Sequence, residues 1–153
     1  MTNKKIKINV PKRVLLLLAS LVWAIAGLNI LRIALEELAI TKHLYLLGVF
    51  GGILGFIAFF KFVFYKMYKK HTFRIVNMEN ERPCIFSFFD KKGYIIMIFM
   101  ITLGIFLRAY NLISGIPLII LYLSLGFALS SASIAFLISG INYKKTLEKY
   151  IIK

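Results

Sequence analysis

Four long apolar runs, at about residues 14–35, 44–65, 94–110 and 117–141, limit how this chain can fold more than any other feature. A bilayer's hydrocarbon core is about 30 Å thick, and an α-helix needs about 20 apolar residues to cross it. Inside lipid every backbone N–H and C=O must find a partner within the protein, which favours helices. We therefore predict an all-α integral membrane protein: one membrane domain over residues 1–153, four transmembrane helices, and a loop over residues 66–93.

Composition supports a membrane protein over a soluble basic one. The chain is 60% hydrophobic with a mean hydropathy of +0.83, well above what a water-soluble domain carries. A net charge of +14 would suggest nucleic-acid binding in a soluble protein. Here the basic residues gather in the segments between apolar runs, where they indicate which side of the membrane each segment faces. We expect no nucleic-acid partner.

The distribution of basic residues predicts the orientation. Sixteen of the 20 lysines and arginines lie before the first run, between the second and third, or after the fourth, and Lys61 lies just inside the second run at the same membrane edge. The other three are Arg32, Lys42 and Arg108. Because cytoplasmic loops carry the excess of Lys and Arg, we predict a multi-pass protein of the cytoplasmic (inner) cell membrane, with both termini and loop 66–93 cytoplasmic.

The N-terminus also resembles a cleavable secretion signal, with basic residues, an apolar stretch and an Ala-Ile-Ala sequence at 24–26. The apolar run continues to Leu35, however, which is too long for the core of an ordinary signal. We expect the first span to remain uncleaved.

The two halves of the chain show a weak correspondence in the same order. Arg32 matches Arg108, each preceded by an apolar residue and a leucine, and Tyr-Lys-Lys at 68–70 matches Tyr-Lys-Lys at 143–145. A duplication would give two parallel two-helix repeats, related by an axis along the membrane normal. Apolar sequences also match by chance, so duplication and coincidence both remain open.

Small residues spaced four apart in the second and fourth runs predict close helix packing. This spacing lets helix backbones approach one another in lipid, where van der Waals contact drives association. We predict tight contact between the second and fourth spans, although a homo-oligomer using the same faces fits equally well. The predicted packing residues are Gly48, Gly51, Gly52, Gly55, Gly126, Ser130 and Ser133.

The sequence contains no recognisable catalytic group inside the predicted spans. Their middles carry no Asp, Glu or Lys, which disfavours ion-coupled transport. The serines have no intramembrane His or Lys to activate them, and no His–carboxylate pair has metal-ligand spacing. We expect a non-enzyme without a cofactor or metal. Cys84, the single cysteine, is expected to be inert.

Three other side chains carry simple predictions. Trp23 falls near the middle of the first span, so we expect it to pack between helices rather than to line a pocket. His43 and His71 border the outer and inner surfaces, where we expect solvent or lipid headgroups around them.

Arg32 and Arg108 lie near the outer ends of the first and third spans. A cation is favoured at a helix C-terminus, and Glu36 and Asn29 are placed to satisfy Arg32 locally. Arg108 has only Asn111 nearby in its own half, so its acidic partners would have to come from across the bundle. Snorkelling and salt bridges explain this pattern, and an outer-facing site for an anion or a lipid headgroup is the alternative.

The segment from Lys61 to Val76 interleaves bases with aromatic residues, which is typical of a membrane-surface segment attracted to anionic lipid. The predicted lipid contacts are Lys66, Lys69, Lys70 and Arg74. The following aromatic stretch, with Phe86, Phe88 and Phe89, suggests docking of a partner or contact with the bilayer surface, and we favour the bilayer.

The sequence thus favours a non-enzymatic membrane protein that assembles with itself, with lipid (especially anionic lipid) or with a membrane-protein partner. The alternative is a small uncoupled transporter, or a translocator of lipid or anions, that uses the arginine pair. The alternative requires a polar cavity near Arg32 and Arg108.

Overall fold

A computed structural model describes residues 8–41, 45–79, 81–88 and 90–151. The regular elements are all helical, and four helices are long and apolar enough to cross a membrane, as predicted. The predictions for Lys42, His43 and Phe89 lie outside the described residues. The elements are α1 (Lys12–Ile40), α2 (Tyr45–Phe59), the π-helix η1 (Phe60–Phe64), α3 (Tyr65–Val76), the 3₁₀-helix η2 (Ile85–Phe88), α4 (Lys91–Ala109), α5 (Ile116–Ile141) and α6 (Tyr143–Tyr150).

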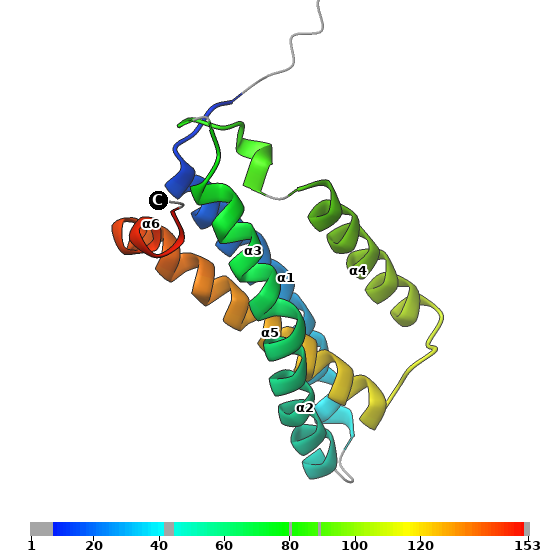
Figure 1. Ribbon diagram of the computed structural model, residues 1–153. Helices are drawn as coiled ribbons and strands as arrows, with labels where there is room; N and C mark the ends of the chain where they lie inside the picture. Colours follow the sequence, from blue (N-terminus) through cyan, green and yellow to red (C-terminus); the bar gives the residue numbers. More distant parts are fainter. Residues whose placement is uncertain (1–7, 42–44, 80, 89, 152–153) are drawn as a thin grey trace, which may run out of the picture.

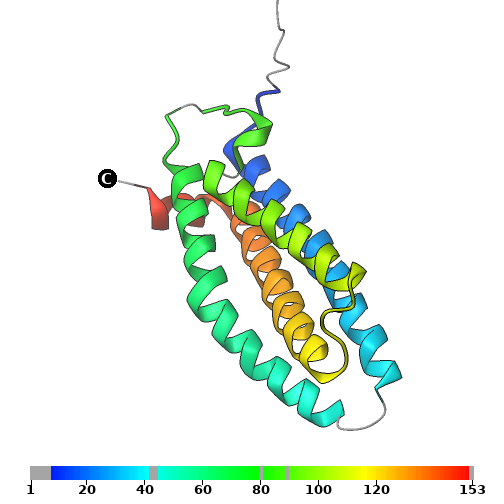
Figure 2. The same cartoon turned by 90° about the vertical axis from the view of Figure 1, so that its right-hand side faces the viewer.

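Helix α5 forms the centre of the bundle, with α1 on one side and the continuous helix α2–η1–α3 on the other (Figures 1 and 2). The start of α1 lies at the same end of the bundle as α6, and the start of α2 lies at the opposite end. We call these the inner end and the outer end, after the predicted orientation.

A line of small residues brings the backbones of α1 and α5 together. Ser20, Gly27 and Ala34 recur every seven residues on α1, and all three are buried. On antiparallel α5 the corresponding residues are Gly126, Ser133 and Gly140, also seven apart. A Cβ on Gly27 would lie 2.9 Å from the backbone nitrogen of Ser130, and one on Gly126 would lie 3.1 Å from that of Leu31. A seven-residue repeat keeps one face of each helix turned towards the other. We call this contact the α1–α5 seam.

Two serines join the helices across the middle of the seam. The Ser20 hydroxyl donates to the Ser133 carbonyl at 2.9 Å, and the Ser133 hydroxyl donates to the Ser20 carbonyl at 2.8 Å. Both residues are buried. The hydroxyl groups therefore find partners inside the bundle, where an unsatisfied polar group would be costly.

The second small-residue contact joins α2 to α5. Cβ atoms on Gly48, Gly51 and Gly52 would lie 2.8–2.9 Å from Ile119, Ile120 and Leu123 respectively. The second and fourth spans are thus in close contact, as predicted, and the glycines of α2 make that contact. The small residues of the fourth span, Gly126, Ser130 and Ser133, also pack against a helix, but that helix is α1 and not the predicted second span.

The helix that contains the second span extends beyond the predicted span, because it continues from Tyr45 to Val76. Residues 66–76, which were predicted to belong to the loop, are therefore helical. Residues 60–64 form a π-helix, whose i→i+5 hydrogen bonds place about one more residue in this turn than an α-helix has. Phe64 is thereby buried against Trp23, with ring centroids 5.9 Å apart in an edge-to-face arrangement. The predicted packing of Trp23 between helices is confirmed.

Helix α4 stands apart from the three helices of the bundle (Figure 1). Of the residues in its most apolar stretch only 6% are buried, against 56% in α5. Even on its least exposed face, a Cβ on Gly104 would meet nothing within 4 Å. Arg32 and Arg108 would be counterparts in the predicted repeat, yet α1 packs along α5 whereas α4 does not. The repeat stays a prediction.

We expect Gly27→Ala to destabilise the bundle, because the new methyl group would press on the backbone of Ser130 and force α1 and α5 apart. The expected loss is about 1–3 kcal/mol, measured as a lower unfolding temperature of the detergent-purified protein. Gly104→Ala is the matched control, since its methyl group meets open space and an alanine favours a helix by up to about 1 kcal/mol. Equal shifts in the two variants would contradict the seam.

Candidate functional site: an arginine pair at the outer end

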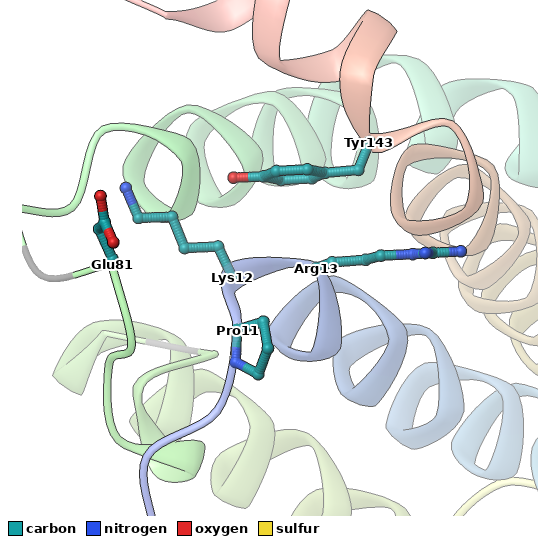
Figure 3. A pocket seen from close by; sticks show the side chains of 5 residues that line it. All are labelled: Pro11, Lys12, Arg13, Glu81 and Tyr143. Atoms are coloured by element: carbon teal, nitrogen blue, oxygen red, sulfur yellow. The ribbon is translucent and has the colours of Figure 1, made fainter.

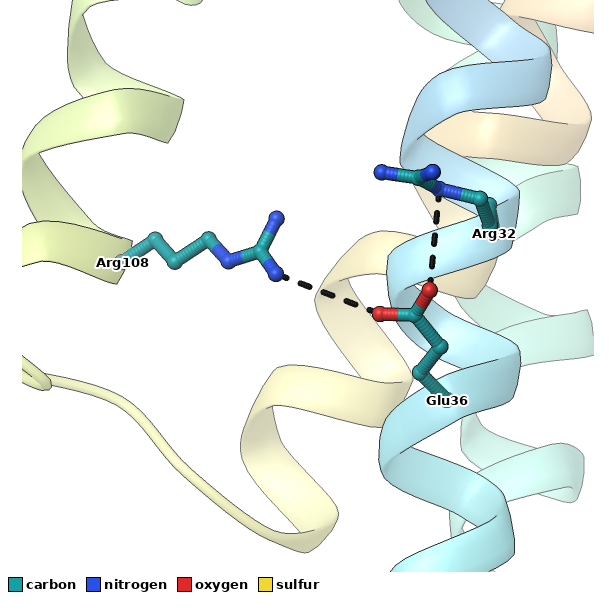
Figure 4. Close-up of polar contacts among 3 residues, drawn as sticks. All are labelled: Arg32, Glu36 and Arg108. Atoms are coloured by element: carbon teal, nitrogen blue, oxygen red, sulfur yellow. Dashed lines mark ion pairs between the residues drawn. The ribbon is translucent and has the colours of Figure 1, made fainter.

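The two arginines singled out in the sequence come together around one glutamate at the outer end. Arg32 Nε lies 3.6 Å from Glu36 Oε1 on the same helix, and Arg108 Nη2 on α4 lies 3.9 Å from Glu36 Oε2 (Figure 4). The three side chains are 52–66% exposed. Arg108 thus finds its acid across the molecule. Exposed ion pairs of this kind contribute about 0–1 kcal/mol each.

The contacts with Glu36 leave most of the hydrogen-bonding capacity of the pair unused. A guanidinium carries five N–H donors. Both N···O separations exceed the roughly 3.2 Å of a good hydrogen bond, and neither arginine makes a bidentate contact. The pair therefore attracts Glu36 by charge, and its donors stay open to a second acceptor.

The two asparagines predicted to join this site are both exposed. Asn29 is on α1, one turn before Arg32. Asn111 follows α4 and has a positive φ of 47°, a conformation that asparagine tolerates better than most residues. Asn111 thus ends the helix that carries Arg108.

Glu37, which the sequence offers beside Glu36 as a possible acidic partner of Arg108, instead joins α1 to the start of α5. Its carboxylate accepts a hydrogen bond of 2.9 Å from the backbone N–H of Gly115, the residue that precedes α5. An acid is favoured at a helix N-terminus. The partners are 78 residues apart, so no local pattern could have paired them.

At the inner end, the basic face predicted to contact lipid divides into two parts. Lys66 and Lys69 are exposed on α3, and Lys69 lies 4.6 Å from the centre of the Tyr65 ring. Lys70 lies 3.8 Å from Asp90 at the start of α4, and Arg74 is partly buried. Lys66 and Lys69 are therefore the members of this set best placed to meet anionic lipid.

Asp90 fixes the inner end of α4. Its side chain accepts a 2.7 Å hydrogen bond from the backbone N–H of Gly93 and so caps the helix. Burial acts to raise the pKa of the Asp90 carboxyl, but the Gly93 hydrogen bond and nearby basic side chains outweigh it. The pKa therefore lies below its usual value.

The prediction of a solvated or lipid-facing His71 was wrong. Its side chain is only 3% exposed, and its ring lies 3.0 Å from where a Cβ on Gly93 would stand. The absence of a side chain at Gly93 thus lets α4 approach α3 at this point.

A shallow pocket of about 340 Å³ lies at the inner end, lined by Pro11, Lys12, Arg13, Glu81 and Tyr143 (Figure 3). Its two cations serve other helices. Lys12 Nζ donates to the carbonyls of Val76 and Met78 at 3.0 and 2.7 Å, and Arg13 Nε donates to that of Gly140 at 2.8 Å. A cation near a helix C-terminus binds its last carbonyls. Lys12 and Arg13 therefore tie the start of α1 to the ends of α3 and α5.

Comparison of the chain with models of known protein families, with curated proteins and with solved structures found no match.

The substitution Asp90→Asn tests how much the negative charge of Asp90 stabilises the contact between the inner end of α4 and α3. Asparagine can still cap the helix but carries no charge. Because the folded-state pKa of Asp90 is depressed, its charge stabilises the fold above the unfolded pKa of about 3.9. That stabilisation is lost as the pH falls through the folded-state value. Unfolding temperatures should therefore be lower for the variant than for the unsubstituted protein at pH 7, and the difference should vanish in acid.

Glu79→Gln removes a charge from an exposed acid near the same connection and is the matched control. An Asp90→Asn effect that equals that of the control, or that grows as the pH falls, would contradict this role of Asp90.

Proposed function

We propose that this protein is a non-enzymatic assembly protein of the cytoplasmic membrane, which uses α4 to bind a transmembrane helix of a second copy or of another protein. The observation that carries the proposal is the separation of α4 from the bundle. The chain closes its core with three helices and leaves the fourth with large apolar side chains exposed.

The lipid-facing side of α2 is apolar too, so exposure alone does not distinguish α4. What differs is the side of α4 that is turned towards the bundle. Met97, Met100 and Leu107 on this side are only partly buried, and the Cβ position of Gly104 is open. Met97 and Met100 pack at the edge of the core, but the open Cβ position of Gly104 leaves room for a neighbour beside the outer half of α4, which α2, held by its glycines against α5, does not have.

The way α4 is attached also supports a binding role. Its polar contacts with other elements include the Lys70–Asp90 pair and a 2.6 Å hydrogen bond from Tyr94 to the Phe86 carbonyl of η2 at the inner end. Farther along the helix they include a 3.3 Å hydrogen bond from Tyr122 to the Gly104 carbonyl and the Arg108–Glu36 pair at the outer end. The two ion pairs are 3.8–3.9 Å long, and three of their four side chains are more than half exposed, so each pair contributes little to stability. Helix α4 can therefore adjust its packing at small cost.

The serine hydroxyls support a non-enzymatic role. Ser20 and Ser133 bond to each other's carbonyls, and Ser124 donates to the carbonyl of Gly52 at 3.2 Å. These hydroxyl groups form hydrogen bonds that join neighbouring helices. A nucleophilic serine instead needs a neighbouring base to take its proton.

The second candidate is a translocator of lipid or anions, and the arginine pair favours it. Beneath the pair, however, α1 meets α5 through the close contact of Gly126 with Leu31. Flux of a fluorescent phospholipid across proteoliposomes that is lost in Arg108→Leu would support translocation. Flux at the level of protein-free liposomes would support assembly.

Photo-crosslinking in native membranes tests the assembly proposal. A photoreactive amino acid replaces Ile98 or Ile105 on α4, and Ile53 or Ile57 on α2 serves as the matched control, since all four isoleucines are about half exposed or more. We expect protein adducts of discrete mass from the α4 positions and lipid adducts from the α2 positions. Adduct mass then identifies a second copy or another chain. Lipid adducts alone from α4, as from α2, would contradict the proposal.

A further inference from the structure

We propose that Arg32 and Arg108 bind the phosphate group of an outer-leaflet phospholipid, which bridges α1 to α4. This site does not depend on which protein partner, if any, α4 binds. It adds a lipid to the assembly as the element that fastens the outer end of α4.

The first argument is depth. Arg13 lies at the inner end, bonded to the carbonyl of Gly140, and Arg32 follows it by nineteen residues on the same helix. At about 1.5 Å per residue the two are about 28 Å apart along the axis, close to the thickness of a hydrocarbon core. If Arg13 is at the inner boundary, Arg32 is at the outer boundary, at the level of lipid phosphates. Arg108, which shares Glu36 with it, is at the same level.

The second argument is geometry. The two guanidiniums extend towards one another from different helices, and each is joined to the Glu36 carboxylate, which lies below Arg32 and beside Arg108 (Figure 4). Their donors are unused by any close hydrogen bond to that carboxylate. A phosphodiester has two non-bridging oxygens that share one negative charge, and guanidinium groups bind such oxygens with paired N–H donors. One phosphate can therefore accept from both arginines.

The third argument is the local charge. Among the described residues, the titratable groups near the two arginines are Glu36, Glu37 and the Tyr122 phenol, and the Glu37 carboxylate is already bonded to the N–H of Gly115 at the start of α5. Glu36 alone thus competes with a phosphate for the pair. Removing the charge of Glu36 should tighten phosphate binding, whereas a purely structural ion pair would only lose a partner.

Lipid binding by the full-length protein in a neutral detergent tests the site. The probe is phosphatidylglycerol, with diacylglycerol as the lipid without phosphate and inorganic phosphate as the headgroup chemistry without acyl chains. We expect phosphatidylglycerol to bind, inorganic phosphate to compete weakly and diacylglycerol not to bind. Binding of inorganic phosphate without binding of phosphatidylglycerol would overturn the assignment to a lipid.

Matched variants distinguish the site from general attraction to a basic protein. Arg108→Gln should weaken phosphatidylglycerol binding about fivefold, as expected for one base near a membrane surface. Arg82→Gln, on the exposed inner connection, should change it much less. Glu36→Gln should strengthen binding, and more than Glu79→Gln does. Arg108→Lys should restore part of the affinity, and helical content by circular dichroism should be unchanged throughout. Equal effects of Arg108→Gln and Arg82→Gln, or weaker binding in Glu36→Gln, would overturn the proposal.

Discussion

The close approach of α1 and α5 is the contact on which the rest of the structure depends. Lipid tails are as apolar as leucine, so helices in a membrane associate through packing and hydrogen bonds rather than through the hydrophobic effect. Gly27 and Gly126 bring the two backbones near enough for Ser20 and Ser133 to bond to each other's carbonyls. Helix α5 is thereby fixed on one side, and the glycines of α2 fix it on the other. Lys12 and Arg13 then tie the inner ends together.

The same seam explains why α4 is set apart. Helix α5 uses its two sides for α1 and α2, and α4 lacks a comparable line of buried small residues. Its polar attachments include Asp90 at the inner end, a hydrogen bond from Tyr122 to the Gly104 carbonyl, and the shared Glu36 at the outer end. The proposed function and the proposed lipid site both follow from this division. A three-helix scaffold presents a fourth helix, and the arginine pair connects that helix to the scaffold where lipid phosphates lie.

Much of the architecture could be predicted from the sequence, because a bilayer requires long apolar helices and these are visible in one dimension. The packing of Trp23 and the closeness of the second and fourth spans also followed from residue type and spacing. Hydropathy could not show that α4 stands apart, since a lipid-facing residue and a helix-facing residue look alike. The seven-residue line at Ser20, Gly27 and Ala34 contains none of the four-residue spacings by which small residues indicate close helix packing. The burial of His71 depends on Gly93, which is distant in sequence.

The central claim is that α1 and α5 form a fixed unit while α4 is held more loosely, and spin-label distances test it most directly. In a Cys84→Ser background, labels at the exposed residues Leu28 on α1 and Ile134 on α5 report on the seam. Labels at Leu28 and at Ile105 on α4 report on the attachment of the fourth helix. Pulsed electron paramagnetic resonance should give a narrow distance distribution for the first pair and a broader one for the second. Equally narrow distributions would contradict the account, because α4 would then be packed as firmly as α5.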